Sequence, residues 1–373
     1  MAVNLLAALD DERYGAAALA RAQAAAARAG FTLRRIDGPD DRLSAWIDFH
    51  FAPSWWSSET RAGNAWVAER DGEIAGFAAF GARGLRFPWL RRWRDTHDVG
   101  IFGPYGVERA LRGGAIGEEL LVAALCSLRA DGFASVLIPA VGFEPLVRMY
   151  VARTGAVVVD EFDYEVGCFR ATILASGAGS NAHAVLERVR DGSLPLDVGA
   201  IITNDERAGA IAVARAHGVE PVVVGWDRAH ESRAAFDARV IAALARTQPQ
   251  LVLLLGWMHL LPDAFLEQFP ETINLHPAFL PLDPAADETI APDGSVIPAL
   301  RGAHALRDAL RDGVAWTGAT VHRVTSRTDR GSVLVRVPLA VGDSTTELEL
   351  RERVRPVEFG AVAAAIRRWT FER

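Results

Sequence analysis

Leu251-Val252-Leu253-Leu254-Leu255-Gly256 is the stretch that decides the fold of the second half of this chain. A short, continuously apolar run of this kind indicates a parallel strand that is buried on both faces. The stretch Asn274-Leu275-His276-Pro277-Ala278-Phe279-Leu280-Pro281 follows it. In open parallel sheets, ligands bind outside the carboxyl ends of the strands. We therefore expect an α/β fold here, with a functional site beside these strand ends.

Three polar side chains suit the transfer of an acyl carbon from one nitrogen atom to another. The Asn274 amide can hold a developing oxyanion, and the His276 imidazole can move a proton. The carboxylate of Asp329, further along the chain, can orient the imidazole and stabilise its charged form. We therefore predict that Asn274, His276 and Asp329 form a catalytic group.

The composition is that of an ordinary globular protein. Of the 373 residues, 50% are apolar and 23% are charged, so the chain can bury a core, and its length favours two domains. The formal net charge of −7 gives no general attraction to nucleic acid or to an anionic membrane, and we expect neither as a partner. The basic run Arg91-Arg92-Trp93-Arg94 is interpreted as a solvated loop.

The sequence shows no targeting signal and no metal-ligand spacing of its cysteines. We expect Cys126 and Cys168 to be buried and reduced, and we expect no metal site. The N-terminus lacks the cationic lead of a signal peptide, and no apolar run has the length of a membrane span. These features predict a cytoplasmic protein.

The chain divides into two domains with different patterns. Residues 31 to about 167 alternate short strands and helices, with a hairpin at Asp71-Gly72, and the Ala-rich segment 14–29 before them is predicted to be a helix. From Arg170 onward, strand–loop–helix repeats predict a mostly parallel sheet that is covered on both faces. We expect the join near 165–171, which gives domains at 1–168 and 169–373.

Short motifs follow one another through the second domain, mostly after its predicted strands. They are Ala175-Ser176-Gly177-Ala178-Gly179-Ser180-Asn181, Ile202-Thr203-Asn204-Asp205, Gly256-Trp257-Met258-His259-Leu260-Leu261, Asn274-Leu275-His276-Pro277, Gly318-Ala319-Thr320-Val321-His322 and Thr328-Asp329-Arg330-Gly331. In this order, the motifs resemble the folate-dependent formyltransferases, most closely the glycinamide ribonucleotide formyltransferases. The resemblance implies a Rossmann-like domain with a mostly parallel sheet.

The resemblance also implies an activity, a donor and a set of site residues. The activity would be an N-formyltransferase that uses 10-formyltetrahydrofolate as donor and the amine of a small molecule as acceptor, with Asn274, His276 and Asp329 as its catalytic residues. Arg233 matches an arginine that reaches both ligands, and His259 stands where the family commonly has arginine. The residues that match segments lining the pterin pocket are Met258, His259, Leu260, Leu261, Thr325, Ser326, Arg327 and Thr328.

The acceptor and the outcome of the reaction stay open. Gly179, Ser180 and Asn181 begin a helix with bare backbone N–H groups, which can bind a phosphate or a carboxylate. The chain departs from the family at an insertion, 282–298, which we expect to reshape the acceptor pocket. Formyltetrahydrofolate hydrolases share the catalytic residues, but there a second histidine usually stands at the position of Pro277. Transfer is therefore favoured, and a hydrolase with a regulatory first domain is the alternative.

The first domain carries a glycine loop between a strand and a helix. In Arg112-Gly113-Gly114-Ala115-Ile116-Gly117, the small residues allow close approach of a phosphate to backbone N–H groups. This loop resembles that of the GNAT acyltransferases, and the resemblance implies a mixed sheet. It also implies contacts with acetyl-CoA or another acyl-CoA through Arg112, Gly113, Gly114, Ala115 and Gly117. Tyr150 stands where the family often places the tyrosine that protonates the leaving thiolate. The domain could be a second acyltransferase, could present substrate, or could have kept the loop without its ligand.

Overall fold

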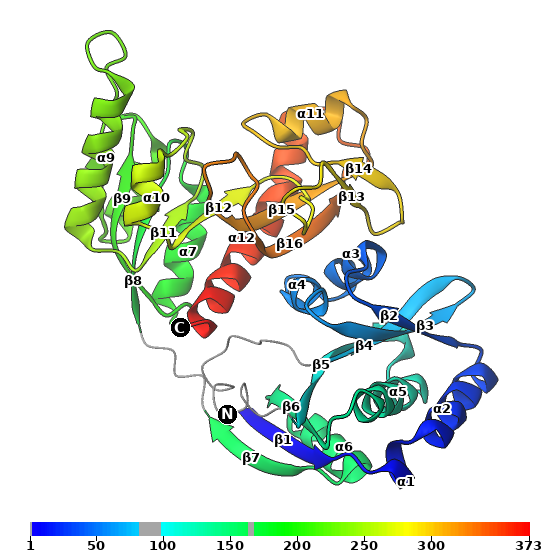
Figure 1. The fold of residues 1–373 in the computed structure, drawn as a ribbon. Helices are drawn as coiled ribbons and strands as arrows, with labels where there is room; N and C mark the ends of the chain where they lie inside the picture. The colour runs from blue at the N-terminus through cyan, green and yellow to red at the C-terminus, as the bar shows by residue number, and fades with distance from the viewer. Residues whose placement is uncertain (1, 82–97, 163–167) are drawn as a thin grey trace. The chain divides into compact units, whose positions relative to one another are not determined.

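A computed structural model describes residues 2–81, 98–162 and 168–373 (Figure 1). The basic run Arg91–Arg94 lies outside these residues. The chain forms two compact units, the first made of 1–50, 56–165 and 372–373 and the second of 51–55 and 166–371. The predicted boundary at 168/169 lies beside the undescribed segment 163–167 and stays a prediction.

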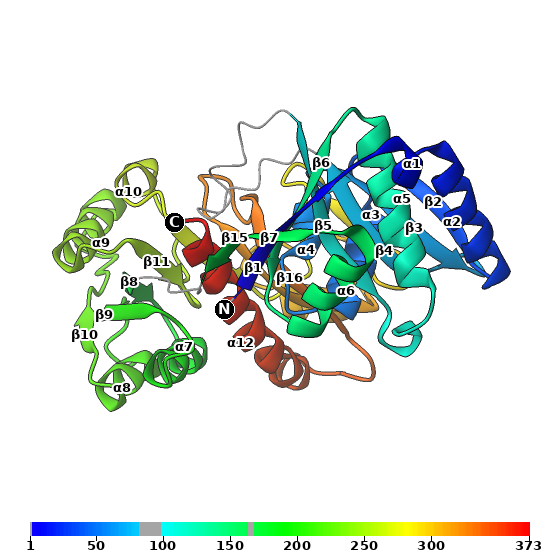
Figure 2. The same cartoon turned by 90° about the horizontal axis from the view of Figure 1, so that it is seen from below.

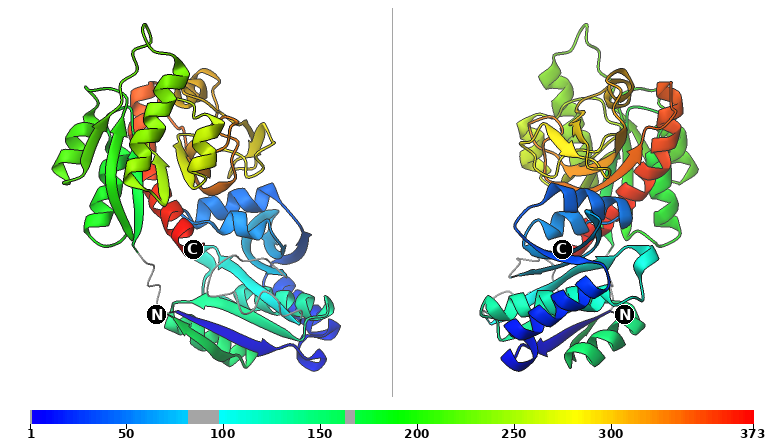
Figure 3. Two further views of the ribbon diagram at one scale, coloured as in Figure 1. Left: turned by 60° about the vertical axis from the view of Figure 1, so that its left-hand side comes forward. Right: turned by 90° about the vertical axis from the view of Figure 1, so that its right-hand side faces the viewer.

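The first unit contains a 7-stranded mixed sheet in the order β2-β3-β4-β5-β6-β1-β7. Its strands are β1 (Ala2–Ala8), β2 (Thr32–Asp37), β3 (Asn64–Arg70), β4 (Glu73–Gly81), β5 (Val99–Val107), β6 (Ser135–Val141) and β7 (Val157–Phe162). Its helices are α1 (Asp11–Tyr14), α2 (Ala16–Arg28), α3 (Asp41–His50), α4 (Trp56–Thr60), η2 (Arg109–Leu111), α5 (Ile116–Ala130) and α6 (Glu144–Thr154). Helices α2 and α5 pack side by side against the sheet, where their apolar faces form one core with the strands (Figures 2 and 3).

The N-terminal segment differs from its prediction. Residues 2–8 form β1, which pairs antiparallel with both β6 and β7, and the helix expected over 14–29 is divided into α1 and α2 at Gly15. Asn4, which is fully buried, donates to Asp160 at 3.0 Å and accepts from the Ala140 N–H at 2.9 Å. The short apolar run was not identified as a strand because these partners lie more than a hundred residues away in the sequence.

The second unit contains a 7-stranded sheet in the order β10-β9-β8-β11-β12-β15-β16. Its strands are β8 (Phe169–Leu174), β9 (Leu196–Thr203), β10 (Glu220–Val223), β11 (Leu251–Leu254), β12 (Thr272–His276), β15 (Trp316–Arg323) and β16 (Val333–Ala340). Its helices are α7 (Ser180–Arg190), α8 (Gly209–Ala216), α9 (Arg233–Thr247), α10 (Asp263–Gln268), α11 (Ala305–Arg311) and α12 (Glu347–Phe371), and the insertion forms the hairpin β13 (Glu288–Ile290) and β14 (Val296–Pro298).

The pattern around β11 explains why this sheet is covered on both faces. The neighbouring strands β10, β9, β8, β11 and β12 are parallel to one another. Strands β15 and β16 are antiparallel to their neighbours. Leu251 and Leu253 pack towards α7, α8 and α12, while Val252 and Leu254 pack towards α9 and α10 (Figure 2). The mixed sheet of the first unit and the mostly parallel sheet of the second confirm the predicted α/β fold class.

Two smaller findings concern single residues and helices. Cys126 is buried as predicted, but the prediction for Cys168 was wrong, because this residue is exposed beside the start of β8. No helix among the described residues is long and apolar enough to cross a membrane.

Candidate active site

A cavity of about 470 Å³ lies at the carboxyl ends of β8, β11 and β12 in the second unit. This is the edge of a parallel sheet at which a ligand site is expected. The loops after these strands, the segment after β15 and one side of α12 form its wall. The lining residues are 176–181, 254–261, 274–277, 302–306, 322 and 324–329, together with Glu347, Arg351, Arg355 and Glu358.

The structure brings the three predicted catalytic side chains together at this cavity. Asn274 and His276 are two residues apart on β12, so their side chains emerge on the same face of the sheet. The Asn274 amide donates to Asp329 Oδ1 at 3.3 Å, and His276 Nδ1 lies 3.5 Å from Asp329 Oδ2. Asp329 is held in a left-handed backbone conformation (φ 51°), and its Oδ2 accepts from the Gly302 N–H at 2.7 Å.

The surroundings of His276 fix where it can take up a proton. Its Nε2 lies 2.6 Å from the Leu300 carbonyl oxygen, which only accepts hydrogen bonds, so Nε2 carries the proton of the neutral ring. Burial lowers the pKa of His276, and the nearby Asp329 charge offsets this only in part. The ring is therefore neutral at pH 7, with a free lone pair on Nδ1 facing the Asp329 carboxylate.

Asp329 stays ionised although it is largely buried. Burial raises its pKa, but the neighbouring His322 and His276 and the hydrogen bond from the Gly302 N–H outweigh burial and bring the pKa well below its ordinary range. A fixed negative charge beside Nδ1 stabilises the imidazolium that forms when His276 accepts a proton.

His322 is a fourth polar residue of this group, and sequence reasoning gave it no role. It is 2% exposed, and its Nε2 lies 3.2 Å from Asn274 Nδ2 and 3.4 Å from Asp329 Oδ1. Its Nδ1 donates to the Arg323 carbonyl at 2.8 Å. The motif Gly318–His322 was the available signal, but the role depends on the antiparallel register that pairs Asn274 with His322.

Eight of the residues predicted to bind folate line the cavity, and Arg233 does not. Met258 and Leu260 expose 59% and 67% of their surface, so apolar side chains stand open to a flat ligand. Arg233 instead donates to the Leu260 carbonyl and pairs with Asp237 at 2.8 Å, so it braces the wall. The other lining residues of this set are His259, Leu261, Thr325, Ser326, Arg327 and Thr328.

His259 packs its ring within an aromatic cluster. Its centroid lies 5.2 Å from that of Phe236, 5.4 Å from that of Trp257 and 5.7 Å from that of Trp226. Burial, together with the charges of Arg233 and Arg228, lowers the pKa of His259. A neutral ring at this point cannot provide the positive charge of the arginine that the family commonly has.

The predicted anion loop also lines the cavity. Gly179 has φ +78°, and α7 begins at the next residue, so the first backbone N–H groups of the helix are open. The Asn181 amide donates to Glu358 Oε2 at 2.9 Å, and burial raises the pKa of Glu358. Arg351, Arg355 and Glu358 of α12 also line the cavity, and the sequence analysis missed all of them because α12 lies far along the chain.

The insertion contacts Asp329 indirectly, through two arginines. Among the described residues, none of 282–298 lines this cavity, and the expectation that the insertion reshapes the acceptor pocket stays a prediction. Instead, Asp287 pairs with Arg301 at 3.0 Å and with Arg330. Arg301 in turn donates from Nε to the Asp329 carbonyl at 3.2 Å. The insertion therefore supports the backbone that positions Asp329.

In the first unit, the predicted acyl-CoA loop connects β5 to α5. Arg112 donates to the Val107 carbonyl at 3.1 Å, and Gly113 has φ +83°. A Cβ on Gly117 would lie 2.3 Å from the Tyr105 hydroxyl, so a larger residue there would require the Tyr105 side chain to shift. Tyr150 is 3% exposed, and burial raises its pKa far above the ordinary value. Gly114 and Ala115 complete the loop.

Comparison with known proteins gives the same division of the chain. Residues 169–366 match the formyl transferase family model, and residues 14–155 match the acetyltransferase (GNAT) family model, which confirms both predicted resemblances, while the domain boundary at 168/169 stays a prediction. The phosphoribosylglycinamide formyltransferase of Mycobacterium tuberculosis is 37% identical over 199 residues, 53% of this chain and 83% of that protein. The Escherichia coli enzyme of the same name is 30% identical over 182 residues, 48% of this chain and 77% of that protein.

A glycinamide ribonucleotide transformylase from Symbiobacterium toebii shares 31% sequence identity, with a TM-score of 0.49 over 57% of this chain and 92% of that chain. The family match spans more than half of the 373 residues and includes every residue of the group around Asp329. The chain therefore belongs to the formyl transferase family, with a GNAT-family domain preceding its formyltransferase domain.

Proposed function

We propose that this protein is a folate-dependent N-formyltransferase, which moves a formyl group from 10-formyltetrahydrofolate to the amine of a small-molecule acceptor. The observation that carries the proposal is the convergence of Asn274, His276 and Asp329 at one wall of the cavity. The relatives named above are phosphoribosylglycinamide formyltransferases. The exposed apolar wall at Met258 and Leu260 suits a flat heteroaromatic ring.

In this mechanism, the acceptor nitrogen forms a bond to the formyl carbon while the formyl oxygen gains negative charge. When substrate is bound, one N–H of the Asn274 amide donates to that oxygen in place of its contact with His322 Nε2, and the loss of such a donor typically costs about 10²–10³ in rate. His276 Nδ1 takes the proton that the acceptor nitrogen loses, and Asp329 stabilises the resulting imidazolium. The same proton is then delivered to the folate nitrogen as its bond to carbon breaks. The products are the formylated acceptor and tetrahydrofolate.

The anion loop and α12 support a polar acceptor with a negative group. Backbone N–H groups at Gly179–Asn181 and the guanidinium groups of Arg351 and Arg355 supply positive potential, and the Glu358–Asn181 pair supplies hydrogen-bonding groups. Because the relatives named above are phosphoribosylglycinamide formyltransferases, phosphoribosylglycinamide is the first acceptor to test.

The test is to incubate the protein with 10-formyltetrahydrofolate and follow tetrahydrofolate release with and without phosphoribosylglycinamide. Release that depends on the amine, with a formylated product in the mass spectrum, is the expected result. Release without any amine would instead support the hydrolase alternative. Replacing His276 by Ala should lower the rate by about 10²–10⁴, while the circular dichroism spectrum is retained. An unchanged rate in this variant would contradict the mechanism.

We also propose that the first unit binds an acyl-CoA at the loop 112–117. Strand β5 pairs with β6 only from Val99 to Ile101, whereas its pairing with β4 extends to Val107. The loop therefore follows a part of β5 that is no longer paired with β6. The loop ends at α5, whose first backbone N–H groups have no side-chain cap. Tyr150 is buried, which argues against a role of its hydroxyl in protonating a leaving CoA thiolate. The geometry therefore supports binding of an acyl-CoA and not acyl transfer.

A further inference from the structure

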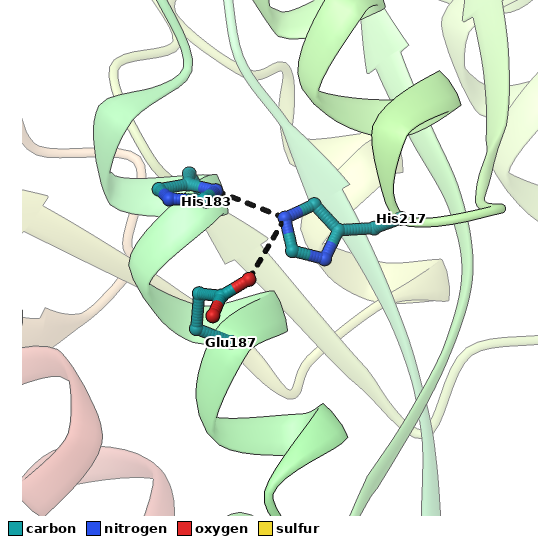
Figure 4. A group of neighbouring side chains, drawn as sticks. All are labelled: His183, Glu187 and His217. Carbon is teal, nitrogen blue, oxygen red and sulfur yellow. Dashed lines mark hydrogen bonds and ion pairs between the residues drawn. The ribbon is translucent and has the colours of Figure 1, made fainter.

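A cluster of three metal-binding side chains lies on the second unit, on residues that do not line the active-site cavity. It consists of His183, Glu187 and His217 (Figure 4). His183 Nδ1 lies 2.9 Å from His217 Nε2, and His217 Nε2 lies 3.5 Å from Glu187 Oε1. One donor atom from each residue lies within 4.8 Å of the other two.

The packing of two helices holds these side chains in place. His183 and Glu187 are one turn apart on α7, so they share a face, and His217 is the residue that ends α8. At the other end of the pair, a Cβ on Gly179 would lie 2.8 Å from Ala210 Cα, and a Cβ on Gly209 would lie 2.8 Å from the Ala178 carbonyl oxygen. The helices are therefore in close backbone contact, which fixes the separation of their side chains.

The carboxylate is also oriented towards the two rings. Glu187 Oε2 pairs with Arg190, which leaves Oε1 for His217. The side chain of His217 is only 7% exposed, whereas that of Glu187 is 36% exposed and His183 stands in solvent. A cation at this point would thus keep part of its coordination open to water.

We propose that His183, Glu187 and His217 form a binding site for a divalent transition metal of the zinc type. Two ligands that are each about 2.0–2.1 Å from Zn²⁺ are separated by roughly 2.9–3.4 Å, for ligand–metal–ligand angles from 90° to tetrahedral. The separations of 2.9 Å between His183 Nδ1 and His217 Nε2 and of 3.5 Å between His217 Nε2 and Glu187 Oε1 fall close to this range. Two imidazoles and one carboxylate are ligands that Zn²⁺ prefers, whereas Mg²⁺ and Ca²⁺ prefer oxygen.

A metal at this site would tie α7 to α8. Helix α7 begins at Ser180, within the loop that lines the cavity, so the cross-link stabilises the helix that carries this loop. The inference does not depend on the formyl transfer reaction, because none of the three ligands is among the cavity-lining residues.

The experiment measures Zn²⁺ binding by the full-length, untagged protein. After chelation and removal of the chelator, equilibrium dialysis against Zn²⁺ with elemental analysis should give about one equivalent per chain. His183→Ala and Glu187→Gln should each weaken this binding at least about tenfold, and His183→Ala/His217→Ala should abolish it. Zn²⁺ should also raise the melting temperature of the wild type, and Mg²⁺ at the same concentration should not.

His230→Ala is the matched control, because His230 is an exposed histidine paired with a single carboxylate, Asp227, at 2.8 Å. This variant should bind Zn²⁺ like the wild type. The melting temperature of each variant without Zn²⁺ shows whether it is folded. Absence of binding by the wild type, or an equivalent of Zn²⁺ retained by the folded double variant, would overturn the proposal. In that case the three side chains form only a His–His hydrogen bond and an ion pair.

Discussion

His276 is buried between a carbonyl and a carboxylate, and this position decides when it carries a proton. Burial lowers its pKa below the ordinary 6.5, so the folded protein keeps it neutral where an unfolded chain would protonate it. Because the unfolded state then binds more protons, the free energy of unfolding should decrease as the pH falls below about 6.5. The lowered pKa of Asp329 also makes the free energy of unfolding decrease as the pH falls. This contribution is lost only below about pH 4, the ordinary pKa of an aspartate.

We therefore expect His276→Gln to show a shallower loss of stability than the wild type between about pH 6.5 and 5. Urea unfolding of both proteins over this pH range measures the difference. The lowered pKa of His259 contributes equally to both proteins and cancels in the comparison. Parallel stability curves would show that His276 titrates normally in the folded state.

Gly179 and Gly177 lie in the same loop but differ in what a side chain would meet. Gly179 has φ +78° and Ala210 Cα 2.8 Å from its missing Cβ, whereas a Cβ on Gly177 would meet nothing within 4 Å. Gly179→Ala should lower the free energy of unfolding by about 2–4 kcal/mol through backbone strain and overpacking. Gly177→Ala should leave it within about 0.5 kcal/mol. Chemical denaturation checks both, and equal effects would contradict the packing argument.

The hairpin of β13 and β14 is an element that acts at a distance from the substrate. Arg336, which is 1% exposed, joins it to β16 by donating to Leu280 O at 2.9 Å and to Thr289 Oγ1 at 3.0 Å. Asp287, the residue before β13, forms ion pairs with Arg301 and Arg330. Arg301 donates to the Asp329 carbonyl, and Arg330 is the next residue in the chain. The insertion thus acts on the catalytic loop through ion pairs.

Asp287→Ala should lower kcat by about tenfold, because Asp329 loses part of its support and small displacements of a catalytic group are costly. The free energy of unfolding should change little, since the Asp287 side chain is exposed to solvent. Glu288→Ala removes a neighbouring exposed carboxylate of the same hairpin and is the control. A kcat that is equal in the two variants would rule out this role of the hairpin.

At the scale of the whole chain, the two units have separate hydrophobic cores. One cluster is built from residues of the first unit, around Leu120 and Phe102, and two others from the second, around Ile173 and Phe236. Each unit is large enough to bury its own core. Ligands of the two sites should therefore stabilise different parts of the molecule.

Calorimetry of the full chain should show two unfolding transitions. Tetrahydrofolate should raise one and acetyl-CoA the other, each by roughly 5–10 °C when the ligand is near one hundred times its Kd. Arg112→Ala, which removes the contact with the Val107 carbonyl, should reduce the response to acetyl-CoA alone. A single transition moved by both ligands would show that the units unfold together. No response to millimolar acetyl-CoA would contradict acyl-CoA binding.

Local residue patterns, each within about ten positions of the sequence, predict much of the fold and of the candidate site. The apolar run at 251–255, the glycine loops and the motif Asn274–Pro277 predict the parallel sheet, the two families and two of the three residues proposed to be catalytic, because burial on both faces and bare N–H groups impose local sequence rules. The helices at 182–190 and 232–247 follow from the same local periodicity.

Only the tertiary structure decided which distant segments meet. The antiparallel register places His322 opposite Asn274, β1 lies between β6 and β7 in the first sheet, and α12 brings Arg351, Arg355 and Glu358 to the cavity. The same reason explains why the sequence analysis expected no metal site: His183 and His217 lie on different helices, and their spacing matches no short motif. Side-chain contacts across a fold depend on strand register and helix packing, which no local pattern encodes.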